Sequence, residues 1–429
     1  MSSRLRASPG EPLSGIAVMP GDKSTSHRAL ILGALAEGET RITGLLESDD
    51  VAATIDALRA FGIRIEREGD TWRVIGGEWR SPCAPIDCGN SGSTARLVMG
   101  AAAGFPISTT LTGDESLRRR PMDRMIAPLT AMGARIEGGE HLPLTIHGGD
   151  LRGIEHVNRF ASAQVKTAVL LAGLRASGEV SLIEPEPSRD HGEIMLREFG
   201  CAVETAYGVV RLGAQRRLRG TAIAIGGDPS SAAFLWTAAA IVPGSAVCTP
   251  GVLVNPLRTG LLDALAAMGG EVSVTNRRLQ SGEWIGDVRV AAAPLSAISL
   301  PAERVPAMID EYPLAAVAAA CAAGTSRFDG LAELRAKESD RLAAIVAGLT
   351  ACGVAAHSEG DSLVVTGRAV PGSASIDSGG DHRIAMAMLT LGLAARRPVT
   401  VDGAEMIATS FPGFAHAMRS IGAEIDELE

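Results

Sequence analysis

One phrase recurs six times along this chain of 429 residues, and it constrains the fold more than any other feature. The phrase is an amphipathic helical stretch, then a large apolar residue or cysteine, then a glycine that leads into a short strand. Successive copies lie 67 to 84 residues apart, at Gly62, Gly133, Gly200, Gly269, Gly353 and Gly422. Self-similarity at a regular spacing is typical of one supersecondary unit used repeatedly. The sequence therefore predicts six α/β repeats.

The first repeat shows the internal order of the predicted elements. β-branched stretches indicate strands, and Ala- and Leu-rich stretches indicate helices. The predicted elements are a strand at 15–21, a helix at 24–38, a strand at 40–46, a helix at 48–62 and strands at 63–68 and 71–77. Each repeat is thus βαβαββ. Its first helix is apolar on nearly all sides, so we expect it to be buried, with the second helix nearer the surface.

Each predicted buried helix begins at a polar turn. The free amides and the positive dipole end of a helix start form a ready anion site. In the first repeat the stretch PGDKSTSHRAL adds Lys23, Arg28 and three hydroxyl groups to that start. If the starts converge, this chain of net charge -9 acquires a cationic site suited to small phosphorylated, carboxylated metabolites. The alternative is that the serines, threonines and aspartates only cap helices.

Lysine is rare in this chain. Of the 40 basic residues, only Lys23, Lys166 and Lys337 are lysines. An ammonium group is a compact charge that can lose a proton, whereas a guanidinium group is a fixed planar fork. One interpretation is that codon bias left three lysines by chance. The other is that lysine marks positions where arginine fails, which the dense polar motifs around Lys23 and Lys337 favour for those two.

Composition and charge argue against several classes of protein. The acidic balance and the 3% share of aromatic residues oppose a general nucleic-acid binder. No apolar run reaches the roughly 18 residues of a membrane span, and the N-terminal stretch has no apolar secretory segment, so we expect neither a membrane protein nor an exported one. The six cysteines include no C-x-x-C pair, which indicates reduced thiols in a cytoplasmic protein.

Eight motifs occur in one order between about residues 13 and 424. They are PGDKSTSHRALILGALAEGETRITGLLESDDV, GNSGSTARL, LTGDESLRRRPM, SAQVKTAVLLAGL, GDPSSAAF, MIDEYPLAAVAAA, ELRAKESDRL and GDHRIAMA. Together they resemble the 5-enolpyruvylshikimate-3-phosphate synthases, a family of enolpyruvyl transferases. The resemblance implies transfer of the enolpyruvyl group of phosphoenolpyruvate to the 5-hydroxyl of shikimate 3-phosphate, with release of phosphate, in the shikimate pathway. It implies no metal and no organic cofactor.

The fold of that family is a two-domain inside-out α/β barrel with three βαβαββ repeats in each domain, in agreement with the six repeats found above. Mapped onto this chain, the resemblance implies one domain at 21–226 and a second formed by 1–20 plus 227–429. It also implies an active site in the cleft between them, which closes when substrates bind. We expect a cytoplasmic monomer that acts on small molecules and binds neither nucleic acid nor a membrane.

The resemblance also assigns the residues of the site. It places shikimate 3-phosphate at Lys23, Ser24, Arg28, Ser162, Ala163, Gln164, Asp310 and Lys337, with Arg189 as a further candidate. It places phosphoenolpyruvate at Lys23, Asn90, Gly92, Arg120, Gln164, Arg341 and Arg383. Arginines suit these anions because a guanidinium group bonds a carboxylate or phosphate through two N–H groups.

Two carboxylates in different surroundings can carry the proton transfers of this reaction. The resemblance assigns Asp310 as the base for the 5-hydroxyl. It assigns Glu338 as the acid, and then the base, at the methylene carbon, and it has Lys23 touch both substrates. The alternative for Asp310 is a helix cap, and Glu311 beside it is expected to be a bystander.

Two positions differ among members of that family. Thr409 stands where some members carry a lysine, so any role of that lysine toward the leaving phosphate falls here to Lys337 or to water, or is not needed. Gly92 matches the position that lines the space for the inhibitor glyphosate, and some tolerant members carry alanine there. The resemblance therefore implies a glyphosate-sensitive enzyme.

Three other functions stay open on the sequence alone. A transferase acting on UDP-N-acetylglucosamine shares the fold, but it resembles a pattern with asparagine and cysteine where Ser24 and Glu115 stand. A metabolite-binding relative without activity is opposed by the presence of Lys23, Asp310 and Glu338. A nucleic-acid end-processing enzyme with the same repeat is opposed by the pI near 5.5.

Overall fold

The six repeat glycines mark equivalent turns in the computed structural model, which describes residues 3–428. Each has a φ between 82 and 115°, the left-handed region that glycine adopts without strain. There the chain leaves a helix and enters a strand. The described chain contains six four-stranded sheets, so the predicted sixfold repeat is confirmed.

All six sheets share one strand order. In each, the first strand is parallel to the second, which is antiparallel to the third strand along the sheet. Three sheets are β14(Ala222–Ala224)-β3(Glu39–Thr43)-β5(Thr71–Ile75)-β4(Arg64–Glu68), β6(Ile86–Asp87)-β7(Ser108–Thr112)-β9(Leu144–His147)-β8(Arg135–Glu137) and β10(Glu155–Val157)-β11(Val180–Ile183)-β13(Val209–Leu212)-β12(Val203–Ala206). The others are β2(Ser14–Ile16)-β15(Ala246–Leu253)-β17(Glu283–Ala291)-β16(Glu271–Gln280), β18(Ser299–Leu300)-β19(Gly324–Phe328)-β21(Ser362–Gly367)-β20(Ala355–Glu359) and β22(Ala374–Asp377)-β23(Val399–Asp402)-β1(Arg4–Ser8)-β24(Glu424–Leu428).

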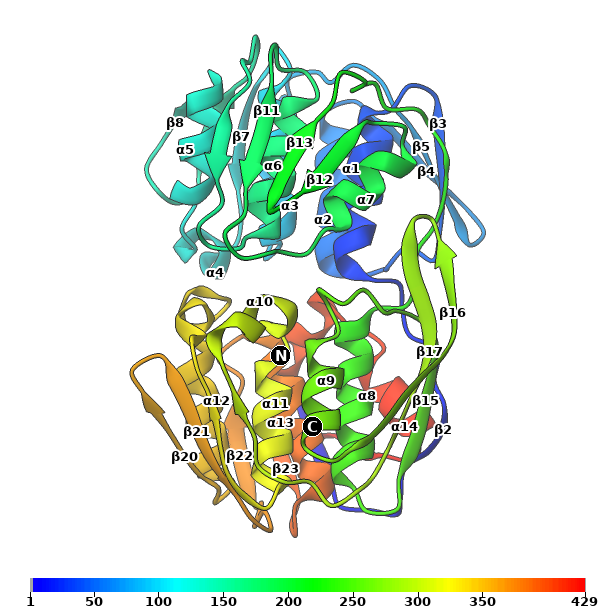
Figure 1. The fold of residues 1–429 in the computed structure, drawn as a ribbon, viewed down its shortest axis with the longest axis vertical. Coiled ribbons are helices and arrows are strands. Elements are labelled where there is room, and N and C mark those ends of the chain that lie inside the picture. The colour runs from blue at the N-terminus through cyan, green and yellow to red at the C-terminus, as the bar shows by residue number, and fades with distance from the viewer. Residues whose placement is uncertain (1–2, 429) are drawn as a thin grey trace. The chain divides into compact units, whose positions relative to one another are not determined.

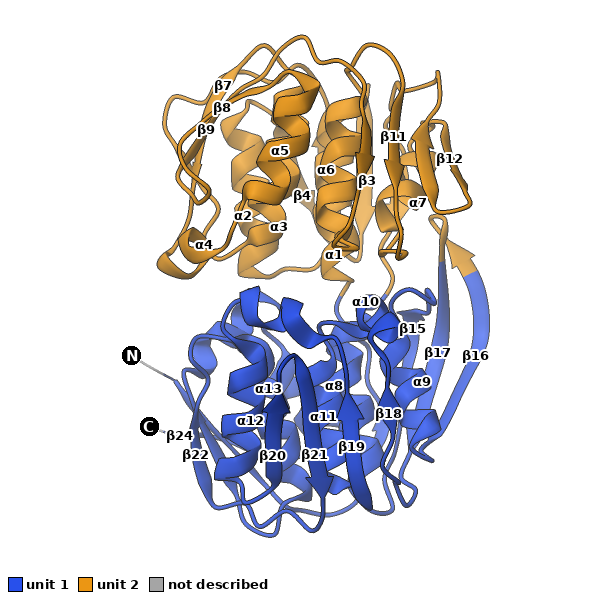
Figure 2. Ribbon diagram, turned by 60° about the vertical axis from the view of Figure 1, so that its left-hand side comes forward, with its two compact units in different colours: residues 1–20, 227–278, 284–429 blue, residues 21–226, 279–283 orange. Residues whose placement is uncertain are grey.

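Contacts divide the chain into two units, which Figure 2 colours separately. Unit 2 consists of 21–226 and 279–283, and unit 1 of 1–20, 227–278 and 284–429. The helices of unit 2 are α1(Lys23–Leu35), α2(Asp49–Ala60), α3(Gly92–Ala103), α4(Glu115–Arg119), α5(Asp123–Met132), α6(Ala163–Gly173) and α7(His191–Glu198). Those of unit 1 are α8(Pro229–Ile241), α9(Gly260–Ala267), η1(Ala302–Arg304), α10(Val305–Met308), α11(Tyr312–Cys321), η2(Leu331–Ala336), α12(Arg341–Ala351), α13(His382–Ala394), η3(Ala404–Thr409) and α14(Phe414–Ser420).

Residues 279–283, at the turn between β16 and β17, are grouped with unit 2. The domain bounds expected from the sequence place these residues in the other domain. The amide of Ala224 donates to the Ser281 hydroxyl at 2.9 Å, and His191 Nδ1 lies 2.5 Å from Glu283 Oε1. Both His191 and Glu283 are buried. These contacts attach the five residues of the turn to β14 and α7.

The first strand of the first repeat was predicted at 15–21, and this assignment is wrong. The strand that forms there, β2, runs parallel to β15 in unit 1. The sheet of the first repeat takes its first strand from β14 instead, with Ile223 paired to Ile42. At the other end, β1 lies between β23 and β24. The local sequence can predict that a segment forms a strand, but it does not predict which sheet a strand joins when the chain passes from one unit to the other nearby.

Each unit has its own hydrophobic core, built around the first helices of its three repeats. In unit 2, α3 packs against α1 and α6, and in unit 1 α8, α11 and α13 contact one another (Figure 1). Every residue of α8 is buried, as the apolar composition predicted. Gly100 lets α3 approach α6 closely, because a Cβ there would lie 2.4 Å from the Ala168 oxygen.

The second helices of the repeats are amphipathic, also as predicted. In α2 the residues Val51, Ile55 and Leu58 are buried, whereas Asp56 and Arg59 are exposed. No helix among residues 3–428 has the length and apolar character needed to cross a membrane.

Candidate active site

The starts of the three buried helices of unit 2 lie close together. Their capping residues are Asp22, Ser91 and Ser162, each of which accepts a hydrogen bond from an amide in the first turn. The expectation that polar residues cap these helices is therefore correct for these three. It does not exclude ligand binding, because most amides of a first turn remain available.

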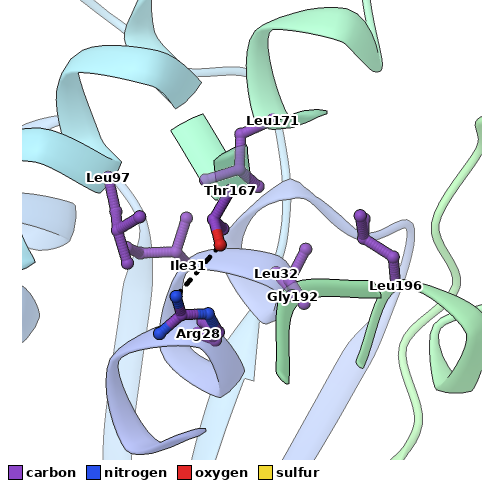
Figure 3. A pocket seen from close by; sticks show the side chains of 8 residues that line it. All are labelled: Arg28, Ile31, Leu32, Leu97, Thr167, Leu171, Gly192 and Leu196. Atoms are coloured by element: carbon purple, nitrogen blue, oxygen red, sulfur yellow. Dashed lines mark hydrogen bonds between the residues drawn. The ribbon is translucent and has the colours of Figure 1, made fainter. Parts of the chain in front are cut away.

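Arg28 joins the starts of α1 and α6. Its Nη1 donates to the backbone oxygen of Ser24 at 2.9 Å. Its Nη2 donates to the Thr167 hydroxyl at 3.0 Å and to the backbone oxygen of Ala163 at 3.4 Å. Figure 3 shows Arg28 pointing toward Thr167. The residues predicted to hold shikimate 3-phosphate on these two helices are thus brought together.

A narrow hollow lies behind Arg28 and leaves no room for a water molecule. Besides Arg28 and Thr167 it is lined by Ile31, Leu32, Leu97, Leu171, Gly192 and Leu196 (Figure 3). Its walls are largely apolar, so it is a gap in the packing of four helices and not a site for an anion.

Lys23 and His27 lie on the same helix as Arg28, within its first two turns. Lys23 forms an ion pair with Asp50 in the first turn of α2, and both side chains are mostly buried. His27 Nδ1 lies 2.7 Å from the Thr54 hydroxyl. Burial, followed by the charges of Lys23 and Arg28, lowers the pKa of His27 well below its usual value, so this histidine is neutral.

A second cluster of unit 2 contains residues predicted to hold phosphoenolpyruvate. Arg120 Nη2 donates to Asn90 Oδ1 at 2.7 Å, and Asn90 Nδ2 donates to Asp114 Oδ2 at 2.7 Å. A Cβ on Gly92 would lie 3.3 Å from Arg120 Nη1 and 3.0 Å from Arg96 Nη1. Asn90, Gly92 and Arg120 therefore share one small region, as the resemblance implies.

Arg96 also belongs to this region, as one of the polar residues at a predicted helix start, although the resemblance assigns it to neither substrate. Its Nη1 donates to Gln164 Oε1 at 2.9 Å, while Gln164 Nε2 donates to the Ser93 hydroxyl at 3.0 Å. Gln164 is thereby fixed between α3 and α6. The signal for Arg96 is a cation near the start of an otherwise apolar helix.

In unit 1 the predicted residues gather around Asp310, which precedes α11. Its Oδ1 accepts hydrogen bonds from Lys337 Nζ at 3.2 Å and Arg341 Nη1 at 3.4 Å. Its backbone oxygen accepts one from Arg383 Nη1 at 3.2 Å. The N-cap position of α11 belongs to Glu311, so Asp310 is not the cap of that helix.

Arg341 connects both predicted catalytic carboxylates of unit 1. It forms ion pairs with Glu338 and Asp310, and its Nε donates to Asp381 Oδ2 at 2.8 Å. Burial acts to lower the pKa of Arg341, but Asp381, Glu338 and Asp310 outweigh it and raise that pKa. The guanidinium group is therefore charged although its side chain is 1% exposed.

Glu311 takes the N-cap position of α11, as the sequence indicated, but its side chain also makes contacts that the sequence did not indicate. It is buried, accepts a hydrogen bond from the Ser230 hydroxyl at 2.5 Å, and lies 3.6 Å from Arg383 Nη1. Arg258 Nη2 donates to the same hydroxyl at 3.0 Å. Glu311 thus links the start of α8 to an arginine of the predicted phosphoenolpyruvate site.

Comparison with known proteins identifies the family. The family described as EPSP synthase (3-phosphoshikimate 1-carboxyvinyltransferase) matches residues 7–418. The chain belongs to the EPSP synthase family. The 3-phosphoshikimate 1-carboxyvinyltransferase of Caulobacter vibrioides is 52% identical over 99% of both chains, and that of Phenylobacterium zucineum is 51% identical over 99% of this chain and 96% of its own.

A solved structure of EPSP synthase from Acinetobacter baumannii aligns with a TM-score of 0.88 at 39% identity, covering both chains completely. The fold is the two-domain inside-out α/β barrel expected from the motifs. The chain is a transferase that carries out the enolpyruvyl transfer of the shikimate pathway. The alternative of an enzyme acting on UDP-N-acetylglucosamine is not favoured, and Glu115, where that enzyme would carry its cysteine, pairs at the surface with Arg119.

Two further positions named in the sequence analysis are Thr409 and Arg189. Thr409 is buried, and its hydroxyl donates to the Met406 oxygen at 2.7 Å and lies 3.4 Å from His382 Nδ1. It supplies no cation. Arg189 lies partly buried in the loop before α7, between buried Ser188 and His191.

Proposed function

We propose that the polar clusters of both units act on the same two substrates, phosphoenolpyruvate and shikimate 3-phosphate. Lys23, Ser24, Arg28, Ser162, Ala163, Gln164 and Arg189 bind shikimate 3-phosphate, together with Asp310 and Lys337. Asn90, Gly92, Arg120, Arg341 and Arg383 bind phosphoenolpyruvate, and Lys23 and Gln164 contact both. Cationic and amide groups of this kind match a phosphate, a carboxylate and ring hydroxyls.

In this proposal Asp310 removes the proton of the 5-hydroxyl, while Glu338 gives a proton to the methylene carbon of phosphoenolpyruvate. The hydroxyl oxygen then bonds to the neighbouring carbon, and the product is a tetrahedral intermediate. Glu338 next takes a proton back from the new methyl group, the carbon–oxygen bond to phosphate breaks, and phosphate leaves. The proton that Asp310 took from the 5-hydroxyl passes to the departing phosphate, so both carboxylates return to their starting states and no other reactant is needed.

The observation that carries this assignment is the shared contact of Asp310 and Glu338 with Arg341. Asp310 Oδ1 also lies 3.2 Å from Lys337 Nζ, whereas Glu338 forms an ion pair with Arg341. The two carboxylates therefore stand in different surroundings, which is what separate roles as base and acid require.

Two matched substitutions test the roles. Asp310→Asn and Glu338→Gln should each lower kcat about 10²–10⁴-fold, the usual cost of losing a positioned acid or base. Both should keep a cooperative melt. Asp361→Asn, which removes an exposed carboxylate of the same unit, is the control. Wild-type kcat in either folded variant would contradict the assigned role.

We also propose that the enzyme works as a cytoplasmic monomer. All six cysteines are free thiols, which is usual in a reducing compartment. Light scattering of the purified protein should give 44.2 kDa, the mass of one chain. Twice that mass at assay concentration would contradict the monomer.

A further inference from the structure

Lys166, the third lysine of the chain, lies buried between two glutamates in unit 2. Its side chain is 1% exposed, and its Nζ lies 2.8 Å from Glu184 Oε2 and 2.7 Å from Glu193 Oε1. It also donates to the backbone oxygen of Ser188 at 3.3 Å. An ammonium group has three N–H donors, so these three acceptors use all of them. A planar guanidinium group cannot place three donors in this way, which explains a lysine here.

Glu184 extends this contact to two loops. Its Oε1 accepts hydrogen bonds from Asn158 Nδ2 at 2.9 Å and from the Ser188 hydroxyl at 2.5 Å. The Asn158 side chain in turn donates to the backbone oxygen of Ser162 at 3.2 Å and accepts a hydrogen bond from the Ser162 amide at 3.3 Å. Lys166 and Glu184 therefore hold the loop that ends at Ser162.

The second loop joins β11 to α7 and carries Arg189. Glu184 lies at its beginning and Ser188 near its end, and Lys166 contacts both. The network thus fixes Ser188, directly before the partly buried Arg189, and Glu193 in the helix that follows it. Ser162 and Arg189 are both assigned to shikimate 3-phosphate, and Lys166 lies on neither loop but on α6.

The two glutamates differ in their partners. Glu184 accepts three hydrogen bonds, whereas Glu193 Oε2 is buried and has no hydrogen-bond partner among residues 3–428. Burial raises the pKa of Glu193, although Lys166 nearby acts to lower it, and Asp190 adds to the rise. With a proton on Glu193, the positive charge of Lys166 is balanced by the single negative charge of Glu184.

We propose that Lys166 is a positioning residue, which acts through Glu184 to hold the Ser162 and Arg189 loops in the geometry that binds shikimate 3-phosphate. This rests on the proposed assignment of those two loops to that substrate. The side chains assigned to phosphoenolpyruvate in unit 2 depend on other contacts. Arg120 is held by Asn90, and Gln164 by Arg96 and Ser93.

The test compares the two substrates in one variant. Lys166→Met keeps an unbranched side chain but removes the charge and all three donors. The KM for shikimate 3-phosphate and its Kd from calorimetry should rise at least tenfold, whereas the KM for phosphoenolpyruvate should change less than threefold. Equal rises in the two KM values, or wild-type constants in a folded variant, would overturn the proposal.

A matched pair of variants serves if Lys166→Met fails to fold. Both oxygens of Glu184 accept hydrogen bonds. In Glu184→Gln one of them becomes an NH₂ group, which faces either the donor of Lys166 or those of Asn158 and Ser188, so at least one of these hydrogen bonds is lost. In Glu193→Gln, Oε1 can still accept from Lys166. The KM for shikimate 3-phosphate should therefore rise several-fold more in Glu184→Gln than in Glu193→Gln, and an equal or reversed effect would overturn the proposal.

Glu179→Gln is the matched control, because Glu179 lies on the surface of the same unit and pairs with Arg211. Its constants should equal those of the wild type. Wild-type enzyme that releases no phosphate with both substrates would refute the proposed function itself. Active wild type with an unchanged KM for shikimate 3-phosphate in Lys166→Met would refute only the role of Lys166.

Discussion

Asp381 holds the guanidinium group of Arg341 through two hydrogen bonds, 2.8 Å from Oδ2 to Nε and 3.3 Å from Oδ1 to Nη2. Both side chains are buried. Arg341 is also the ion-pair partner of Asp310 and Glu338. The cation that the two proposed catalytic carboxylates share is therefore placed by a third carboxylate, which lies at the start of α13.

Asp381→Asn should separate this role from helix capping. Asparagine can still accept the Arg383 amide as Asp381 does, but it no longer carries the charge opposite Arg341. We expect kcat/KM for phosphoenolpyruvate to fall about tenfold or more, a loss of roughly 1.4 kcal/mol of transition-state stabilisation. Steady-state kinetics at saturating shikimate 3-phosphate measure it.

The control for this variant is Asp340→Asn, which alters the more exposed cap of α12 in the same way. Its effect on kcat/KM should be much smaller. Similar losses in both variants would mean that capping, and not the contact with Arg341, explains the result.

Lys23→Arg tests whether this position needs an ammonium group. Lys23 is the first residue of α1, and its charge is paired with Asp50. Arginine keeps the charge but changes the position of the donors, so we expect turnover to fall at least about tenfold. Asp50→Asn should also impair turnover, and the exposed neighbour variant Asp49→Asn serves as its control. Near-normal turnover of Lys23→Arg would contradict the argument from the scarcity of lysine.

The repeat could be predicted from the sequence because its signals are local. A glycine at positive φ after a helix and an apolar helix at the start of each repeat depend only on neighbouring residues, and both are present in all six copies. The sheet that β2 joins could not be predicted, since pairing with β15 is decided by where the chain passes between units. The place of 279–283 was missed for the same reason.

The candidate site shows the same limit. The motifs supply Asp310, Lys337 and Arg341, and the structure brings these three into contact. They do not show what Glu311 contacts, because its partner Ser230 is distant in sequence. Likewise no spacing indicates that Lys166 meets both Glu184 and Glu193, since three separate segments of the chain must fold before the charges are paired.

Gly92→Ala should affect binding at the phosphoenolpyruvate position. The new methyl group would lie 3.0 Å from Arg96 Nη1 and 3.3 Å from Arg120 Nη1, so the guanidinium groups must shift by a few tenths of an ångström. We expect the wild type to be inhibited by glyphosate, and the inhibition constant to rise more than the KM for phosphoenolpyruvate, because the longer ligand needs space that the substrate leaves free. Equal rises in both constants, or a tolerant wild type, would contradict this.

His27 should make stability depend on pH. Burial, Lys23 and Arg28 lower its pKa in the folded state, and Asp22 opposes them only in part. The unfolded chain therefore binds a proton near pH 6.5 that the folded chain does not, and the free energy of unfolding falls as the pH drops below about 6.5. The slope contributed by this group is at most about 1.4 kcal/mol per pH unit.

Urea unfolding between pH 5 and 8 measures this contribution. His27→Asn removes the titrating group and keeps a side chain that can bond Thr54, so its unfolding free energy should fall less steeply toward pH 5 than that of the wild type. The exposed His416→Asn is the control and should retain the wild-type slope. A His27→Asn slope equal to the wild-type slope would show that His27 does not titrate on unfolding.

The central claim is that both polar clusters serve one transfer between phosphoenolpyruvate and shikimate 3-phosphate. It is tested most directly by the phosphate that the purified wild-type protein releases from phosphoenolpyruvate. We predict release only when shikimate 3-phosphate is present, in equal amounts with the enolpyruvyl product, and none when UDP-N-acetylglucosamine replaces it. Release without shikimate 3-phosphate, or release with UDP-N-acetylglucosamine instead, would contradict the account.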